Sequence, residues 1–293
     1  MDTVLYALSS VVLRSANSVF DRVSYGLHRQ SIVLLNFVNN FLPFVLLVLV
    51  LAATKAGDAE LNWAVFLDMR LALFALSVQL VAFTFSFGFR RLTVSKVNVA
   101  SRMGDLLIPL ALMLSGSEVQ TSDYVFAAAI SVSTVLLGNS DITQRRLLLL
   151  PAGLITSAVV LQSLCGAFFF EGVSTHTVHL EVTTAIMGWR SVFCLTLVAV
   201  RRSSAHGAQL RVLWTNSRMR RNALLRAVFT VVSQLLFVLA LSTDEPVIAW
   251  PILNSVTLFS MGFASVVIKE HPKRNEVLAI AAVVVLSLIK GML

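Results

Sequence analysis

Four polar side chains follow one face of an apolar stretch near residue 100. They are Asn98, Ser101, Arg102 and Asp105, and their spacing places them on the same side of an α-helix. An arginine at the centre of a bilayer costs roughly 2.5 to 3.5 kcal/mol on insertion scales, so it usually faces a partner or a water-filled cavity. Either Arg102 and Asp105 form a closed ion pair across one turn, or the four residues line a transport cavity. The length of the stripe favours the cavity.

A second arginine, Arg190, stands in the middle of another apolar stretch. Too few acids lie within apolar stretches to pair with every arginine there, so Arg190 contacts either a substrate or a carbonyl or carboxylate of the chain. Trp189, next to Arg190 in the sequence, and Trp250, in the ninth apolar stretch, would shape the cavity. The other candidates for substrate binding or for the cavity wall are Arg14, Asn17, Gln79, Gln162, Gln234, Trp250, Asn254 and Thr257.

Two further groups of polar residues have two interpretations. Ser10, Arg14, Asn17 and Asp21 share helical spacing, and three asparagines, Asn36, Asn39 and Asn40, precede Pro43. Polar side chains in membranes either hydrogen-bond one helix to another or line a cavity, and the pattern is compatible with both.

The composition indicates a membrane protein. Of the 293 residues, 57% are hydrophobic and 13% charged, with a mean hydropathy of +0.84, which is far more apolar than a soluble domain. A spanning helix needs roughly 20 apolar residues. Continuous apolar runs without strand-like alternation predict an all-α fold with about ten transmembrane helices. These lie near residues 3 to 20, 31 to 53, 69 to 88, 94 to 114, 122 to 138, 151 to 170, 179 to 200, 223 to 242, 246 to 268 and 275 to 292.

The chain repeats itself. Residues 94–138 and 246–290 each consist of an apolar span, a short turn with Glu118 or Glu270, and a second apolar span. This predicts a first five-helix repeat over 1–138, a basic linker over 139–150 and a second, inverted five-helix repeat over 151–293. Most lysines and arginines lie in alternate connections, so we expect those connections in the cytoplasm and both termini on the other side.

Other classes of protein are disfavoured. The net charge of +8 is placed in membrane-flanking connections, which argues against a nucleic-acid partner. His176, His179 and Glu181 do not have the spacing of a helical zinc site, and no phosphate loop or nucleophile elbow is present. We therefore expect no metal, no cofactor and no enzymatic activity. Without an ATPase domain, transport would run on a gradient or by exchange.

Several segments resemble one family. Residues 17–22 are similar to the N-x-x-x-D-K end of a first helix, residues 94–109 to a fourth helix with small residues and then a proline, and residues 244–246 stand where a G-P pair often precedes the ninth helix. Ser117-Glu118 and Lys269-Glu270 resemble the G-E turn that begins the closing helix of each repeat. The whole chain thereby resembles the EamA-like ten-helix carriers of the drug/metabolite transporter superfamily. That resemblance implies two inverted five-helix halves around a central cavity, and alternating access.

We therefore expect a secondary transporter of a small polar or anionic organic metabolite, multi-pass in a plasma membrane, most simply the bacterial inner membrane. Arg102 and Arg190 would attract negative groups, and Asp105 would respond to a coupling proton or bind an amine; a counter-substrate could replace the proton. One alternative is an exporter of cationic or drug-like compounds that bind Asp105. Another is a membrane scaffold or subunit that transports nothing, in which the polar stripes only join helices.

Overall fold

The computed structural model describes most of the chain, but not all of it. The described residues are 2–28, 30–54, 63–102, 113, 121, 124–129, 132, 150–151, 153–162, 164–165, 179–201, 204–241, 252 and 256–292. Within them the regular structure is helical and contains no strand. The prediction of an all-α fold is confirmed for this part of the chain.

Most of the helices coincide with apolar stretches of the sequence. The helices are α1 (Asp2–Asp21), the π-helix η1 (Arg22–Leu27), α2 (Ile32–Thr54), α3 (Trp63–Leu67), α4 (Met69–Arg91), α5 (Val94–Arg102), α9 (His179–Val200), α10 (Ser204–Thr215), α11 (Ser217–Leu241), α13 (Val256–Val267) and α14 (Arg274–Met292). Of these, α3 and α10 do not coincide with such a stretch. Local signals set some of the ends. Asp68 caps α4, because its carboxylate accepts a hydrogen bond from the backbone N–H of Arg70.

Three of these helices are long and apolar enough to cross a membrane: α2, α4 and the segment Leu180–Val200 of α9. All three carry large apolar side chains on the outside of the molecule. Leu49, Leu73 and Leu195 are 61%, 55% and 52% exposed. Water would oppose such exposure along whole helices, whereas lipid tails favour it. The chain therefore has the properties of an integral membrane protein.

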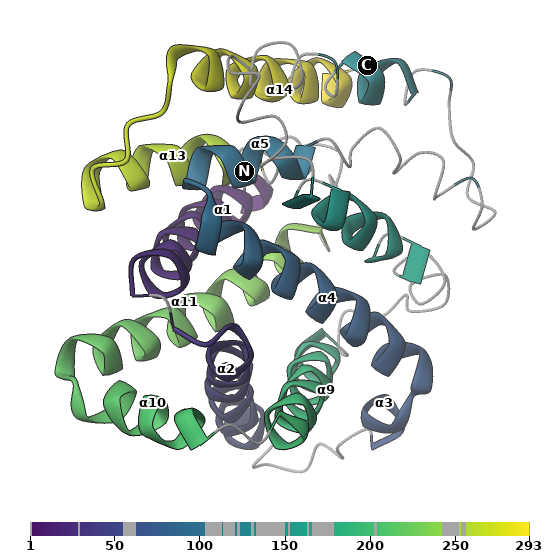
Figure 1. The fold of residues 1–293 in the computed structure, drawn as a ribbon. Helices are drawn as coiled ribbons and strands as arrows, with labels where there is room; N and C mark the ends of the chain where they lie inside the picture. Colours follow the sequence, from purple (N-terminus) through teal and green to yellow (C-terminus); the bar gives the residue numbers. More distant parts are fainter. Residues whose placement is uncertain are drawn as a thin grey trace.

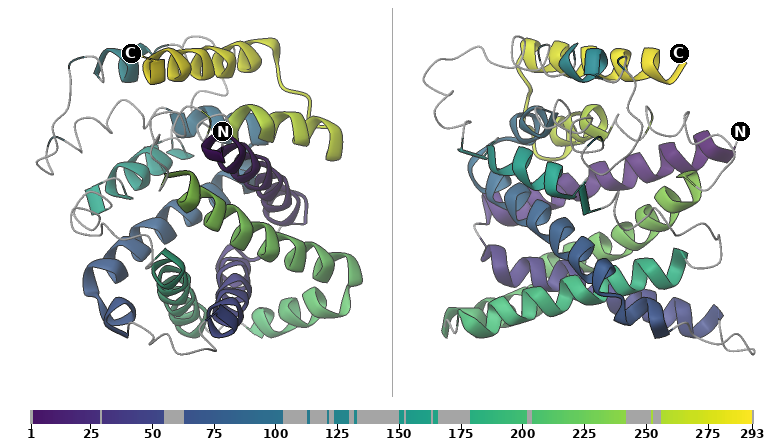
Figure 2. Two further views of the ribbon diagram at one scale, coloured as in Figure 1. Left: turned by 180° about the vertical axis from the view of Figure 1, so that it is seen from behind. Right: turned by 90° about the vertical axis from the view of Figure 1, so that its right-hand side faces the viewer.

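The helices pack against one another in several pairs (Figure 1). α2 and α9 run side by side, and α4 packs against α9. α1 lies along α11, and it also contacts α13. Because Ser10 meets Ser233 while Asp21 meets Arg226, α1 and α11 run in opposite directions. α5 contacts both α13 and α14, and the left-hand view of Figure 2 shows α14 at the top of the molecule and α10 at the bottom.

The turn between α13 and α14 fastens the end of the chain to its beginning. One carboxylate oxygen of Glu270 accepts a hydrogen bond from Arg22 Nε at 2.6 Å, and the other accepts one from the backbone N–H of Val94 at 3.1 Å. Arg22 also donates to the carbonyl oxygen of Phe89. Glu270 thereby joins η1, the first turn of α5 and the α13–α14 turn in one cluster.

The residue before Glu270 has an unusual backbone. Lys269 has a φ of 55°, in the left-handed region where a side chain is disfavoured and glycine is not. We predict that Lys269→Gly raises the free energy of unfolding by about 0.5 to 1 kcal/mol, since the relief of strain exceeds the extra chain entropy of glycine. Thermal unfolding in detergent measures this change. The exposed Lys273→Gly is the control and should be neutral or destabilising; equal destabilisation by both substitutions would contradict the prediction.

Candidate functional site

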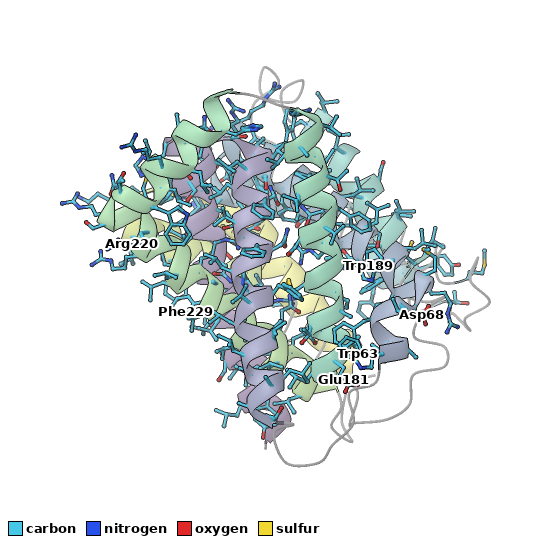
Figure 3. All side chains as sticks on the ribbon, turned by 90° about the horizontal axis from the view of Figure 1, so that it is seen from below. Trp63, Asp68, Glu181, Trp189, Arg220 and Phe229 are labelled. Carbon is cyan, nitrogen blue, oxygen red and sulfur yellow. The ribbon has the colours of Figure 1, made fainter. Side chains whose placement is uncertain are left out.

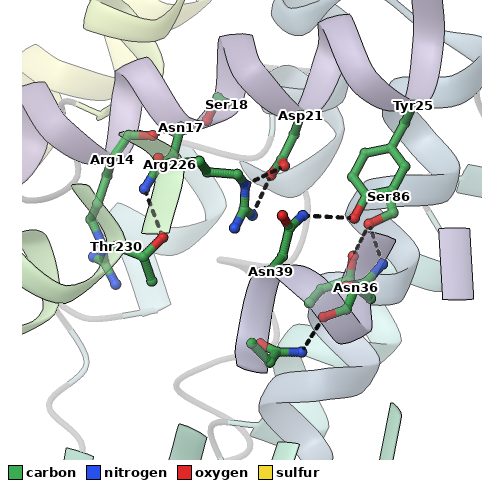
Figure 4. Close-up of polar contacts among 12 residues, drawn as sticks. Arg14, Asn17, Ser18, Asp21, Tyr25, Asn36, Asn39, Ser86, Arg226 and Thr230 are labelled. Atoms are coloured by element: carbon green, nitrogen blue, oxygen red, sulfur yellow. Dashed lines mark hydrogen bonds and ion pairs between the residues drawn. The ribbon is translucent and has the colours of Figure 1, made fainter. Parts of the chain in front are cut away.

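The polar stripe of α1 is largely used in pairing with α11. Ser10 Oγ donates to the carbonyl oxygen of Ser233 at 2.9 Å, and Asn17 Nδ2 donates to Thr230 Oγ1 at 3.2 Å. At the end of the helix, Asp21 accepts two hydrogen bonds from Arg226, at 2.7 and 3.0 Å. Figure 4 shows the Asn17 and Asp21 contacts in a row along the helix. These three positions join one helix to another.

Arg14 differs from the other residues of this stripe. Its guanidinium carbon lies 4.5 Å from the centre of the Phe237 ring, a cation–π contact, and no carboxylate among the described residues pairs with it. One turn away, the buried Asn17 Oδ1 has no hydrogen-bond partner within the described part of the chain. A charged donor and an unused acceptor therefore lie close together in the α1–α11 interface.

A second polar cluster joins α2, α4 and α9. Gln79 Oε1 accepts hydrogen bonds from Asn40 Nδ2 at 2.9 Å and from Arg190 Nε at 3.1 Å, and Gln79 Nε2 donates to Asn36 Oδ1 at 3.2 Å. Asn36 also donates to Ser86 Oγ. Asn36, Asn40 and Gln79 are at most 3% exposed. In this cluster the asparagines hydrogen-bond between helices, which is one of the two roles expected of them.

Arg190 has a chain partner, but an uncharged one. The sequence left open whether Arg190 contacts a substrate or a carbonyl or carboxylate of the chain. In the structure it contacts a carbonyl, the amide oxygen of Gln79. The second contact of its guanidinium is a 3.7 Å approach to Met187 Sδ, and thioether sulfur is a weak acceptor. A guanidinium has five N–H donors, so most of the hydrogen-bonding capacity of Arg190 is not used by strong acceptors among the described residues.

Two other arginines have their charge neutralised by a carboxylate of the chain. Arg226 forms a two-bond ion pair with Asp21, and Arg22 pairs with Glu270. These four side chains are only 15% to 18% exposed. Arg14 and Arg190 are half-buried as well, but no acid of the described residues balances their charge.

The hollows beside these helices are small. One, lined by Asn39, Asn222 and Arg226 among others, has a volume of about 10 Å³, and a second, beside Gln30 and Gln209, has about 20 Å³. A single water needs roughly 10 to 15 Å³ measured in this way, so neither hollow could hold an organic molecule.

The residues predicted for the site have different outcomes. Arg14, Asn17, Gln79 and Arg190 lie in the two clusters above. Asn98 is buried on α5, with its Nδ2 lacking a partner in the described part, and Ser101 Oγ donates to the carbonyl oxygen of Asn98. Gln162 and Gln234 are half-buried on their helices. Outside the described residues lie Asp105, Trp250 and Asn254, together with the side chains of Arg102 and Thr257.

The sequence analysis missed Arg226, which neutralises Asp21. A signal was present, because Arg226, Thr230 and Ser233 share helical spacing on α11 and match the polar stripe of α1. Tyr25 was missed as well. Its hydroxyl accepts a hydrogen bond from Asn39 at 3.2 Å, and the π-helical turn that positions it has no recognisable sequence pattern.

The amide cluster allows a direct test of its structural role. We predict that Asn40→Leu lowers the free energy of unfolding by about 1 to 2 kcal/mol, because Gln79 and Cys194 lose a hydrogen-bond partner inside the protein. Unfolding in detergent by heat or by added SDS measures the loss. The control is Thr196→Val, whose hydroxyl bonds only to its own helix at an exposed position. Equal stability of Asn40→Leu and the native protein would show that the cluster does not hold the helices together.

Comparisons with known proteins identify only the fold. No family model matches this sequence, and no curated protein matches it. Among solved structures, one described only as "Crystal structure of protein" superposes with a TM-score of 0.63 at 12% sequence identity, over 99% of this chain and 98% of the other. The likeness shows the fold alone.

Proposed function

We propose that this protein is a secondary transporter of a small organic anion, working by alternating access in a plasma membrane such as the bacterial inner membrane. The observation that carries the proposal is the pair of enclosed arginines, Arg14 and Arg190, without a balancing acid in the described residues. An unbalanced cation inside a membrane protein is unfavourable unless water or an anion reaches it during the working cycle. A carboxylate or phosphate group of the cargo would supply the missing charge.

The proposed architecture is about ten transmembrane helices in two inverted five-helix repeats, as in EamA-like carriers. Support comes from the helices that begin and end close to the expected spans, and from the α13–α14 turn. In that turn Lys269 has the backbone conformation that favours glycine, at the position where the resembled family carries glycine before glutamate. The small hollows fit a closed conformation, so the proposal requires a second conformation open to one side.

A scaffold that transports nothing is the second candidate, and one observation favours it. The side chains of Asn36, Asn40 and Gln79 hydrogen-bond α2 to α4, as expected of residues that only hold helices together. The export of cationic compounds depends on Asp105, outside the described residues, because Asp21 is already neutralised by Arg226.

Uptake into proteoliposomes distinguishes these functions. The purified chain would be tested with labelled carboxylates, amino acids, phosphorylated metabolites and a cationic dye, each with and without a pH gradient. The transporter proposal predicts faster uptake of at least one anionic class than in protein-free vesicles. Uptake of the dye alone would favour the cationic exporter. No uptake of any class, from protein shown to be folded by its thermal unfolding, would favour the scaffold.

A further inference from the structure

The turn between α10 and α11 carries an exposed basic surface that the transport proposal does not use. It consists of Trp214 and four arginines close to it in the sequence, Arg211, Arg218, Arg220 and Arg221, and all of these side chains are exposed. We call this set the hairpin patch. Figure 3 places Arg220 at the outer edge of the molecule. We propose that the hairpin patch binds the phosphate of anionic lipid headgroups, and this inference holds whether or not the protein is a transporter.

The hairpin patch lies at the depth where lipid headgroups are found. Gln30, just before the membrane helix α2, donates a hydrogen bond from Nε2 to Met219 Sδ at 3.3 Å. Met219 stands between Arg218 and Arg220, so these arginines are level with the point where α2 enters the apolar layer. Leu213 is buried in the same apolar cluster as Leu35 of α2, which fixes α10 at this level.

No acid among the described residues forms an ion pair with the hairpin patch. The sequence has no aspartate or glutamate between residues 182 and 243, and none of the four arginines is ion-paired to a described residue. Within the described part of the chain, their guanidinium groups make one hydrogen bond, from Arg220 Nη1 to the carbonyl oxygen of Trp214 at 3.4 Å. The remaining N–H donors are free for phosphate oxygens, which guanidinium groups bind with two parallel hydrogen bonds.

The geometry also explains why the arginines project outward. Asn216 Oδ1 accepts hydrogen bonds from the backbone N–H groups of Arg218 and Met219, and so caps the start of α11. Leu210 and Leu213 fasten the inner side of α10, leaving Arg211 and Trp214 on the outer side. Tryptophan prefers the interface between headgroups and tails. A rigid turn thus presents four guanidinium groups and one indole to the same layer of the membrane.

Native mass spectrometry of the protein in detergent would test the proposal. Phosphatidylglycerol and phosphatidylcholine of the same chain length are added in equal amounts, and the retained lipid of each type is counted. For the native chain we expect a clear preference for phosphatidylglycerol that weakens as ionic strength rises. In the variant R211Q/R218Q/R220Q/R221Q, the ratio of retained phosphatidylglycerol to phosphatidylcholine should fall by on the order of tenfold.

The matched control is R90Q/R91Q/K269Q/R274Q, which removes the same charge from exposed positions on other basic turns. We expect it to keep the native preference within about twofold, because screening confines the attraction to nearby charges. Thermal unfolding in phosphatidylcholine confirms that each variant is folded. The proposal is overturned if the hairpin variant retains the native preference, or if both variants lose it equally, since net charge alone would then account for lipid binding.

Discussion

Asp21→Asn is expected to lower the free energy of unfolding by roughly 2 to 4 kcal/mol, one of the two largest effects predicted for this protein. The substitution keeps the shape of the side chain but removes its charge. Arg226 then remains enclosed, 16% exposed, with no anion to replace the carboxylate that it contacts at 2.7 and 3.0 Å. SDS-induced unfolding, extrapolated to zero SDS, measures the loss.

The double variant Asp21→Asn with Arg226→Gln should recover part of this stability, because it removes the uncompensated cation. Asp68→Asn is the matched control. Asp68 pairs with Arg70, which is 72% exposed, and asparagine caps a helix about as well as aspartate, so the expected change is under about 1 kcal/mol. If Asp21→Asn were no more harmful than Asp68→Asn, the Asp21–Arg226 pair would add nothing to stability.

Arg190→Gln is expected to slow the uptake of the anionic cargo by roughly 10- to 100-fold. This factor corresponds to the free energy that a hydrogen bond to a charged group contributes. Glutamine can still donate to Gln79, so the amide cluster can keep its contact while the charge is lost. Arg190→Lys keeps the charge but lacks the planar guanidinium group, so its uptake rate should lie between those of the native chain and Arg190→Gln. Initial uptake rates at several cargo concentrations measure the effect.

The control for this experiment is Arg70→Gln, which removes an arginine that is 72% exposed and pairs with Asp68 rather than with either cluster. Its uptake should match that of the native chain. If Arg190→Gln transported normally but unfolded more easily, Arg190 would be a structural residue that fastens α9 to α4. If Arg14→Gln alone impaired uptake, the cargo site would lie in the α1–α11 interface instead.

The course of the fold was largely predictable from the sequence. Apolar runs of bilayer length mark α2, α4 and α9 almost to the residue, because in lipid the backbone has few alternatives to a helix. The short helix α10 was not predicted. Its 12 residues include polar and basic side chains, so no apolar run reveals it, and its position depends on Leu213 reaching the core formed by α2.

The contact partners of the polar residues were harder to predict than the helices that carry them. The stripe containing Arg14, Asn17 and Asp21 was visible in the sequence, but its contacts depend on which helix lies alongside α1. Arg190 was recognised as a buried charge, yet its amide partner Gln79 lies on another helix, 111 residues away in the chain. Helical periodicity shows which residues share a face, whereas tertiary packing decides what that face meets.

The Asp21–Arg226 ion pair has a consequence for the way this protein is made. Its partners are separated by 205 residues, and Arg22 and Glu270 by 248. At roughly 5 to 20 residues per second, a ribosome would need on the order of 10 to 40 s after making Asp21 before Arg226 exists. During that interval the first helix enters the membrane before the partners of Asp21 and Arg22 have been synthesised. A nascent chain stalled before α11 should therefore be a preferred substrate for membrane quality-control proteases.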